Sequence, residues 1–230
     1  MAADLAQRLA AVRDRVDAAA EAADRDPRRV TLIAVSKTHP AEVVDAAVAA
    51  GAMELGENRV QEASAKKPGV RAARWHLIGP LQRNKVKVAL EVFDVIHTVD
   101  RPKLAERLHL LLEKHWPERV VDVMLEVNVG DEPQKAGVAP GDAADLLAAA
   151  TNLDRLRVCG LMAIPPFGTE AEASRPYFRA LRDLRDRLQD ASGRSLPELS
   201  MGMSHDFEIA VTEGATMVRV GTAIFGPRGG

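Results

Sequence analysis

One lysine, Lys37, follows directly on the first strongly apolar segment of the chain. Residues 30–36 read Val-Thr-Leu-Ile-Ala-Val-Ser, a run rich in β-branched residues that predicts a strand buried on both faces. Pro40 then opens a helical pattern that Gly51 ends, so the lysine is expected at the carboxyl end of the strand. In α/β proteins this end of the sheet carries the chemistry, and an amine there can form a Schiff base with an aldehyde.

A second group of polar residues lies near the carboxyl terminus. Arg219 interrupts the apolar residues 217–221, where a guanidinium is costly unless it meets an anion or a hydrogen-bond acceptor. Ser204, Gly221 and Thr222 follow the last two predicted strands. Hydroxyls and approachable backbone N–H groups are what a phosphate site requires. These residues therefore predict a cation and a phosphate site close to each other.

The lysine, the arginine and the phosphate site together fit a phosphorylated aldehyde. The lysine would condense with the aldehyde once burial or a neighbouring cation lowers the lysine's pKa. The residues alone leave two ligands open, a phosphorylated sugar in a Schiff-base aldolase and pyridoxal 5′-phosphate (PLP). The competing interpretation of Arg219 is a core ion pair with a carboxylate such as that of Glu126. Neither a glycine-rich dinucleotide fingerprint nor a metal site is predicted.

Eight apolar segments, with helical patterns between them, are expected to position these residues. The predicted strands are residues 30–36, 53–58, 74–79, 95–99, 120–129, 157–164, 198–203 and 217–221. Residues 3–23 form an additional amphipathic helix, and Ser174 is expected to cap the helix after the sixth strand. Eight βα units predict one (β/α)8 TIM barrel domain over residues 1–230, with an open doubly wound sheet as the runner-up. In a barrel the eighth strand pairs with the first, which brings Arg219 beside Lys37.

The composition and the charge argue against two classes of protein, those that bind nucleic acid and those that span a membrane. The 230 residues are 47% hydrophobic but only 3% aromatic, so the predicted core is aliphatic. The formal net charge of −2, with charges well mixed, argues against nucleic-acid binding. Cys159, the one cysteine, lies in an apolar strand and is interpreted as a buried thiol in a reducing compartment. No apolar stretch approaches the ~20 residues of a membrane span, so we expect a cytoplasmic protein without nucleic-acid or membrane partners.

Six motifs match one known family in order. They are residues 34–40 (AVSKTHP), 56–62 (GENRVQE), 75–85 (WHLIGPLQRNK), 160–165 (GLMAIP), 199–204 (LSMGMS) and 218–226 (VRVGTAIFG). Through these motifs the chain resembles the pyridoxal phosphate homeostasis protein family along nearly its whole length. That family is similar to the N-terminal barrel domain of alanine racemase, a fold type III PLP protein.

The resemblance implies PLP as the cofactor and a set of residues that bind it. PLP would form a Schiff base with Lys37, and Arg219 would face the pyridine nitrogen. The implied residues are Lys37, Asn58 in the pocket wall, Arg219 at the ring, and Ser204, Gly221 and Thr222 at the phosphate. The sequence departs from the family's pattern at Arg59 and His205. His76 lies in a matched motif and is interpreted as a hydrogen-bonded strand histidine.

The resemblance implies a carrier or buffer of PLP in vitamin B6 homeostasis, without catalytic residues. A guanidinium stays charged, so Arg219 should leave the pyridine nitrogen unprotonated, and the ring then stabilises carbanions weakly. A racemase also needs a second acid–base group, and the only tyrosine, Tyr177, falls on the apolar face of an outer helix. The alternative is a PLP-dependent amino-acid racemase of fold type III. We expect a monomer whose partners are PLP and apo PLP-dependent enzymes.

Overall fold

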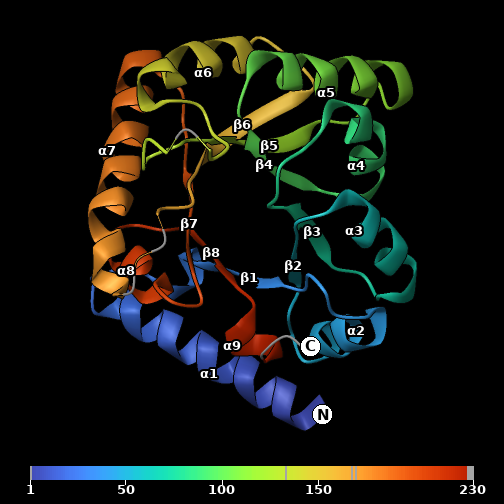
Figure 1. The fold of residues 1–230 in the computed structure, drawn as a ribbon, viewed down its shortest axis with the longest axis vertical. Coiled ribbons are helices and arrows are strands. Elements are labelled where there is room, and N and C mark those ends of the chain that lie inside the picture. The colour runs from blue at the N-terminus through green and yellow to red at the C-terminus, as the bar shows by residue number, and fades with distance from the viewer. Residues whose placement is uncertain (1, 133, 167, 169, 227–230) are drawn as a thin grey trace.

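A closed barrel of eight parallel strands forms the centre of the protein. The computed structural model describes residues 2–132, 134–166, 168 and 170–226, so the outermost residues of the predicted domain, 1 and 227–230, lie outside it. The strands pair in sequence order and β1 pairs with β8, which closes the sheet (Figure 1). They are β1 (Thr31–Val35), β2 (Glu54–Glu57), β3 (Arg74–Leu77), β4 (Val95–Val99), β5 (Val121–Glu126), β6 (Leu156–Met162), β7 (Glu198–Met203) and β8 (Met217–Val220). The predicted TIM barrel is confirmed, and the open doubly wound sheet is excluded.

The helices form a ring outside the strands (Figure 1). They are α1 (Ala2–Glu21), α2 (Ala41–Ala49), α3 (Val60–Lys66), α4 (Val86–Val92), α5 (Pro102–His115), α6 (Ala143–Thr151), α7 (Arg175–Ser192), α8 (Phe207–Thr212) and α9 (Thr222–Phe225). The sequence patterns did not predict the short helix α9. Within the described ranges, none of these helices combines the length and the apolar character that crossing a membrane requires.

The N-terminal helix α1 packs over the place where the barrel closes. It contacts α2, α8 and α9, the helices that flank β1 and β8 along the chain. Arg13 ties the helix to the start of β1, because its guanidinium donates to the carbonyl oxygens of Pro27 (2.8 Å) and Val30 (2.7 Å). One face of α1 is buried at helical spacing. The buried residues are Leu5, Leu9, Val12, Val16 and Ala20.

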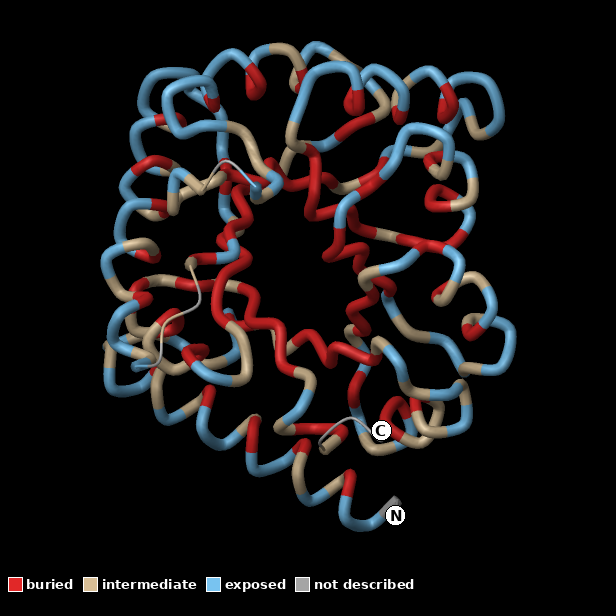
Figure 2. The backbone as a smooth tube through the Cα atoms, in the orientation of Figure 1, coloured by how far each residue is buried: buried red, intermediate tan, exposed pale blue. Residues whose placement is uncertain are grey.

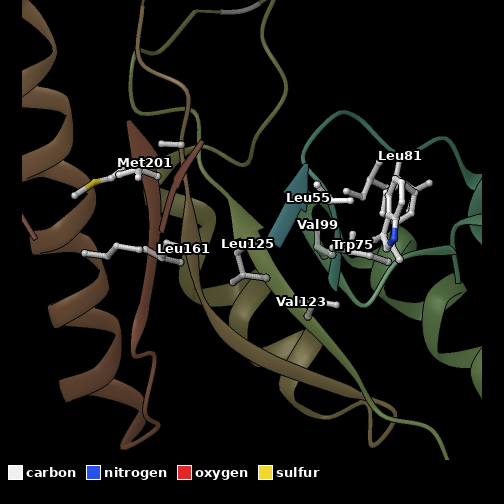
Figure 3. Packing of buried hydrophobic residues seen from close by; sticks show 14 of the residues in the cluster. Leu55, Trp75, Leu81, Val99, Val123, Leu125, Leu161 and Met201 are labelled. Carbon is white, nitrogen blue, oxygen red and sulfur yellow. The ribbon is translucent and has the colours of Figure 1, made fainter. Parts of the chain in front are cut away.

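Side chains along each strand alternate between the outer helices and the barrel interior. The larger buried cluster lies between strands and helices, where Trp75 packs near Leu81 and Met201 points toward α7 (Figure 3). Figure 2 shows buried strands and exposed outer helix surfaces. A separate apolar cluster inside the barrel contains Ile33, Met124, Met162 and Met217. The strands also carry buried polar side chains, among them His76, His97 and Arg219, which belong to the site described below.

Strands β6 and β7 approach closely at Gly160. This glycine pairs with Glu198 in the register of the two strands. A Cβ atom at this position would lie 1.9 Å from the carbonyl oxygen of Glu198, so any other residue would force the strands apart. The glycine that begins the GLMAIP motif is therefore required by the packing of the barrel wall.

The cysteine lies in the barrel wall, at a position unsuited to nucleophilic chemistry. The Sγ atom of Cys159 is 3.3 Å from the carbonyl oxygen of Val123 on the neighbouring strand. Burial raises the pKa of Cys159 to about 12, with the charges of Asp122 and Glu198 adding to the effect. Because the thiolate is the reactive form, this thiol is unreactive near neutral pH, although Cys159 is partly exposed and not fully buried as the sequence interpretation expected.

Candidate functional site

The residues that the sequence singled out gather at the carboxyl ends of adjacent strands. Asn58 follows β2 directly, and Ser204 follows β7. Gly221 follows β8 directly, and Thr222 begins α9. Lys37 lies in the turn after β1. Since β7, β8, β1 and β2 are consecutive around the closed sheet, all of these residues belong to one sector of the rim that carries active sites in TIM barrels (Figure 1).

Direct contacts join the loops of this sector. The backbone N–H of Gly221 donates to Oγ of Ser204 at 3.1 Å, which leaves the serine's own proton to be donated. A Cβ atom at Gly221 would lie 3.2 Å from the carbonyl oxygen of Val35, so β8 approaches β1 closely. The ring of His39 stacks on Phe225 of α9, with centroids 4.9 Å apart. The turn after β1 thus touches the segments that were predicted to bind phosphate.

The half-buried Lys37 lies in a backbone turn with an unusual conformation. Thr38 has φ of 70°, a left-handed value that is rare for a β-branched residue. The N–H of His39 donates to the Ser36 carbonyl at 3.2 Å, and the N–H of Thr38 donates to the Glu62 carboxylate on α3. The strained turn therefore depends on a carboxylate from a neighbouring helix.

A buried ion cluster supports this turn. The Lys66 ammonium lies 2.8 Å from the carbonyl oxygen of Ser36, 2.7 Å from Oε1 of Glu57 and 2.6 Å from Oε1 of Glu62. The Ser36 hydroxyl also donates to Glu57 at 2.7 Å. Burial raises the pKa of Glu57, and Lys66 and Ser36 oppose this effect only in part. Burial would raise the pKa of Glu62 as well, but hydrogen bonds from Lys66 and Thr38 outweigh it and lower that pKa.

Arg219 is buried inside the barrel, and its partners are neutral oxygens. Its Nη1 donates to the carbonyl oxygen (2.7 Å) and to Oγ (2.6 Å) of Ser200, and Nη2 donates to the Ala163 carbonyl at 2.9 Å. Burial lowers the pKa of Arg219 to about 10, against the charges of Glu126 and Asp206, so it stays protonated at neutral pH. Hydrogen bonding to Ser200 and Ala163, and not the considered ion pair with Glu126, holds the guanidinium.

Glu126, the last residue of β5, is an unusual carboxyl group on the same inner wall. Its Oε2 atom has no hydrogen-bond partner among the described residues. Burial raises the pKa of Glu126 to about 7, with the charge of Asp100 adding to the effect and that of Arg219 opposing it. The group is therefore partly protonated at neutral pH, within the electrostatic field of the buried guanidinium.

The turn that carries Ser204 is fixed by a second buried carboxylate. Oδ1 of Asp206 accepts the N–H of Met203 at 2.8 Å, and Oδ2 accepts the hydroxyl of Ser174 at 2.7 Å. Ser174 occupies the predicted N-cap position of α7, but its side chain makes no capping hydrogen bond, so the predicted side-chain cap is wrong. Ser174 has helical angles (φ −79°, ψ −20°), and its hydroxyl is used as a donor to Asp206.

Replacing Asp206 with alanine should loosen this turn. Two buried donors, the Met203 N–H and the Ser174 hydroxyl, would lose their acceptor. Leaving such donors unsatisfied should lower the free energy of unfolding by about 1–3 kcal/mol. Urea denaturation measures the change, with the exposed Asp190→Ala on α7 as a matched control. Equal unfolding midpoints for the two variants would contradict this account of the turn.

Comparison with known proteins connects this geometry to a family. A family model described as "Alanine racemase, N-terminal domain" matches residues 7–229. Pyridoxal phosphate homeostasis proteins of Aquifex aeolicus and Escherichia coli (strain K12) are 45% and 42% identical to this chain. These matches cover 96% and 98% of this chain and 97% of each relative. The chain belongs to the pyridoxal phosphate homeostasis protein family.

Solved structures support the assignment to the pyridoxal phosphate homeostasis protein family. PipY of Synechococcus elongatus, solved with PLP bound, is 41% identical and superposes with a TM-score of 0.84. The match covers 96% of this chain and 100% of PipY. An alanine racemase of Clostridium difficile is 13% identical, with a TM-score of 0.71 over 56% of its length, and shares the fold.

The sequence analysis missed residues that support the site in this member of the pyridoxal phosphate homeostasis protein family. Glu57 and Glu62 both lie in the GENRVQE motif, but their role as partners of one ammonium was not inferred. The available signal was the spacing of Glu62 and Lys66, which places opposite charges one helical turn apart. Nothing in the local pattern indicates that Lys66 reaches the carbonyl oxygen of Ser36, 30 residues away.

Proposed function

We propose that this chain holds PLP on Lys37 and supplies or buffers it in the cell, without turning over amino acids. The contact that brings Ser204 and Gly221 against the end of β1, next to the lysine turn, is the observation that carries the proposal. The relatives are named for PLP homeostasis, and PipY has been solved with PLP bound. On this proposal the whole chain acts as one PLP-binding domain.

The residues in place fit the chemical groups of PLP. PLP supplies an aldehyde, for which the Lys37 amine is the partner, and a phosphate. The hydroxyl proton of Ser204 and the exposed hydroxyl of Thr222 are available to phosphate oxygens. Asn58, half-buried after β2, would line the pocket. Arg219 uses three of its five N–H groups on protein oxygens, which leaves donors for a ring nitrogen.

The state of Arg219 favours a carrier over an enzyme. With a pKa of about 10 the guanidinium remains charged, so it should keep a facing pyridine nitrogen unprotonated. Such a ring is a poor sink for the electrons of a carbanion. Tyr177, the only tyrosine of the sequence, lies on α7 on the outside of the barrel (Figure 1). The position of Lys37 in the turn on the barrel rim would leave a bound cofactor within reach of a free amine, which is what exchange of the cofactor requires.

Glu126 favours the alternative, a PLP-dependent racemase. A buried carboxyl group with a pKa of about 7 is suited to acid–base chemistry at neutral pH. A racemase function therefore predicts amino-acid turnover that Glu126→Gln abolishes. The carrier function predicts no turnover in either protein.

The carrier proposal can be tested by transfer of the cofactor. Protein loaded with PLP is mixed with an apo PLP-dependent enzyme, in the presence of a phosphatase that hydrolyses free PLP. If the apo enzyme recovers more activity with the loaded protein than with an equal amount of free PLP, the protein supplies PLP while protecting it from the phosphatase, as proposed. Racemisation or decarboxylation of common amino acids with kcat of about 1 s⁻¹ or more would overturn the proposal in favour of an enzyme.

Replacing Thr222 with valine should reduce the preference for the phosphorylated ligand. The side chain is exposed at the start of α9, so the change is expected to leave the fold intact. A hydrogen bond to a charged group contributes about 1.5–3 kcal/mol, which corresponds to roughly 10–150-fold in affinity for PLP. Absorbance titrations with PLP and with pyridoxal measure the ratio, and Thr151→Val on α6 is the control variant. An unchanged ratio would place the phosphate elsewhere.

A further inference from the structure

A continuous chain of polar side chains crosses the barrel interior from β2 to β8. Nε2 of His76 is 2.6 Å from Oε2 of Glu54, and Nδ1 of His76 is 2.8 Å from Nε2 of His97. Nδ1 of His97 is 2.9 Å from Oγ of Ser200, which lies 2.6 Å from Nη1 of Arg219. His76 is thus confirmed as a hydrogen-bonded strand histidine, and its bonds connect it to the site.

When neither histidine carries a second proton, the groups at the two ends of this hydrogen-bond chain allow only one direction of donation. A guanidinium can only donate and a carboxylate can only accept. Nε2–H of His76 donates to Glu54, so Nδ1 of His76 accepts from Nε2–H of His97. Nδ1 of His97 then accepts the proton of the Ser200 hydroxyl, and Oγ of Ser200 accepts from Arg219. In this arrangement both histidines are Nε2–H tautomers, and the hydrogen-bond chain runs from a cation to an anion.

The environment of the hydrogen-bond chain favours a neutral His97. His76, His97 and Ser200 are fully buried, whereas the carboxylate of Glu54 is partly exposed. Burial holds the pKa of His97 well below its usual value, and the positive charge of Arg219 adds to the effect. A second proton on His97 is therefore strongly disfavoured at neutral pH, which preserves the single direction of donation.

Core packing alone does not explain why hydrogen-bonded polar side chains are buried inside the barrel. Inward positions of TIM barrels are usually filled by branched apolar residues, as Ile33 is here. Burying imidazoles and a hydroxyl costs free energy unless each group is paired, and pairing all of them restricts each to one geometry. The member of the hydrogen-bond chain that belongs to the predicted site is Arg219, two residues before Gly221.

We propose that Ser200, His97, His76 and Glu54 are positioning residues that hold the Arg219 guanidinium in one orientation toward the PLP ring. The inference rests on the proposed function, since it assumes that Arg219 faces the pyridine nitrogen. Each hydrogen bond orients the donor of the next one. A change at Glu54 on β2 therefore alters the orientation of the Arg219 guanidinium on β8.

The first test uses histidine tautomers in the protein without PLP. ¹⁵N NMR of labelled histidine should show His76 and His97 as single Nε2–H tautomers. Glu54→Gln should keep both signals, because the glutamine carbonyl oxygen can still accept. Glu54→Met removes the acceptor and should give mixed tautomers at both histidines. A wild-type His97 protonated at Nδ1, or His97 signals unchanged in Glu54→Met, overturns the proposal.

The second test uses the absorption band of bound PLP, which reports on the ring nitrogen. Glu54→Met should shift this band, and Glu54→Gln should restore the wild-type position. The exposed Glu42→Met on α2 is the control and should leave the band unchanged. An unshifted band in a folded, PLP-loaded Glu54→Met protein overturns the proposal.

The two proposals fail in different ways. Loss of the proposed function would appear as failure of borohydride to fix PLP on Lys37 in the wild type. The tautomer measurement does not involve PLP, so it tests the hydrogen-bond chain even in that case. Single Nε2–H tautomers that respond to Glu54→Met would then still establish the chain as the device that orients Arg219.

Discussion

Replacing Lys37 with alanine should abolish covalent binding of PLP. The lysine lies in the turn after β1, where the loops after β7 and β8 meet the barrel rim. An amine at this place can condense with the cofactor aldehyde, and alanine offers no nucleophile. Lys66 is not expected to substitute, because its ammonium is buried and already bonded to three oxygens. Borohydride reduction followed by peptide mass mapping should find the pyridoxyl group on the Lys37 peptide of the wild type and not in the variant.

A lysine on the same rim provides the control for this experiment. Lys85 lines a groove together with Asn58 and Arg59, so it samples a similar environment. Lys85→Ala should retain full labelling on Lys37. Labelling of the wild type at Lys85 or Lys135 in place of Lys37 would refute the assignment of the cofactor lysine.

Replacing Lys66 with methionine should destabilise the protein by about 3–5 kcal/mol, the usual cost of removing one partner from a buried ion pair. Methionine preserves the length of the side chain but leaves the fully buried Glu57 without its cation. The carbonyl oxygen of Ser36 loses a donor as well, so the Lys37 turn should also become less ordered. Urea denaturation measures the stability, and the yield of borohydride labelling measures the order of the turn.

The pH dependence of the free energy of unfolding should show that the buried carboxyl group of Glu57 causes the loss of stability in Lys66→Met. Burial already raises the pKa of Glu57 above its unfolded value, and loss of the ammonium should raise it further. The folded state then keeps a proton that the unfolded state releases, so the free energy of unfolding falls as pH rises. The loss of stability should therefore be smaller at mildly acidic pH than at neutral pH.

Two further proteins complete the Lys66 experiment. The double variant Glu57→Gln/Lys66→Met removes the buried charge and should recover part of the stability. Lys103→Met, at an exposed position of α5, should have little effect. If Lys66→Met and Lys103→Met have the same stability, the ion cluster does not support the turn as described.

The fold follows from regularities that are local in the sequence. The predicted strands 95–99 and 198–203 coincide with β4 and β7, because continuous apolar segments of this length suit strands covered on both faces. The prediction failed where a contact between distant segments competes with a local pattern. Ser174 occupies the N-cap position of α7, but its hydroxyl does not cap the helix, because the buried carboxylate of Asp206, 32 residues away, takes it as a donor.

The sequence by itself determined the barrel, the family and the strand ends at which Lys37, Ser204 and Gly221 lie. These features depend on the order and spacing of apolar segments, and barrel closure then brings the first and last strands together. Only the tertiary structure decided which side chains pair inside the barrel and beneath the lysine turn. Ser200 and His97 are 103 residues apart, and their hydrogen bond exists because strand register sets both side chains at one level of the closed sheet. Such pairing leaves no periodic signal in the sequence, since it depends on the geometry of the whole barrel.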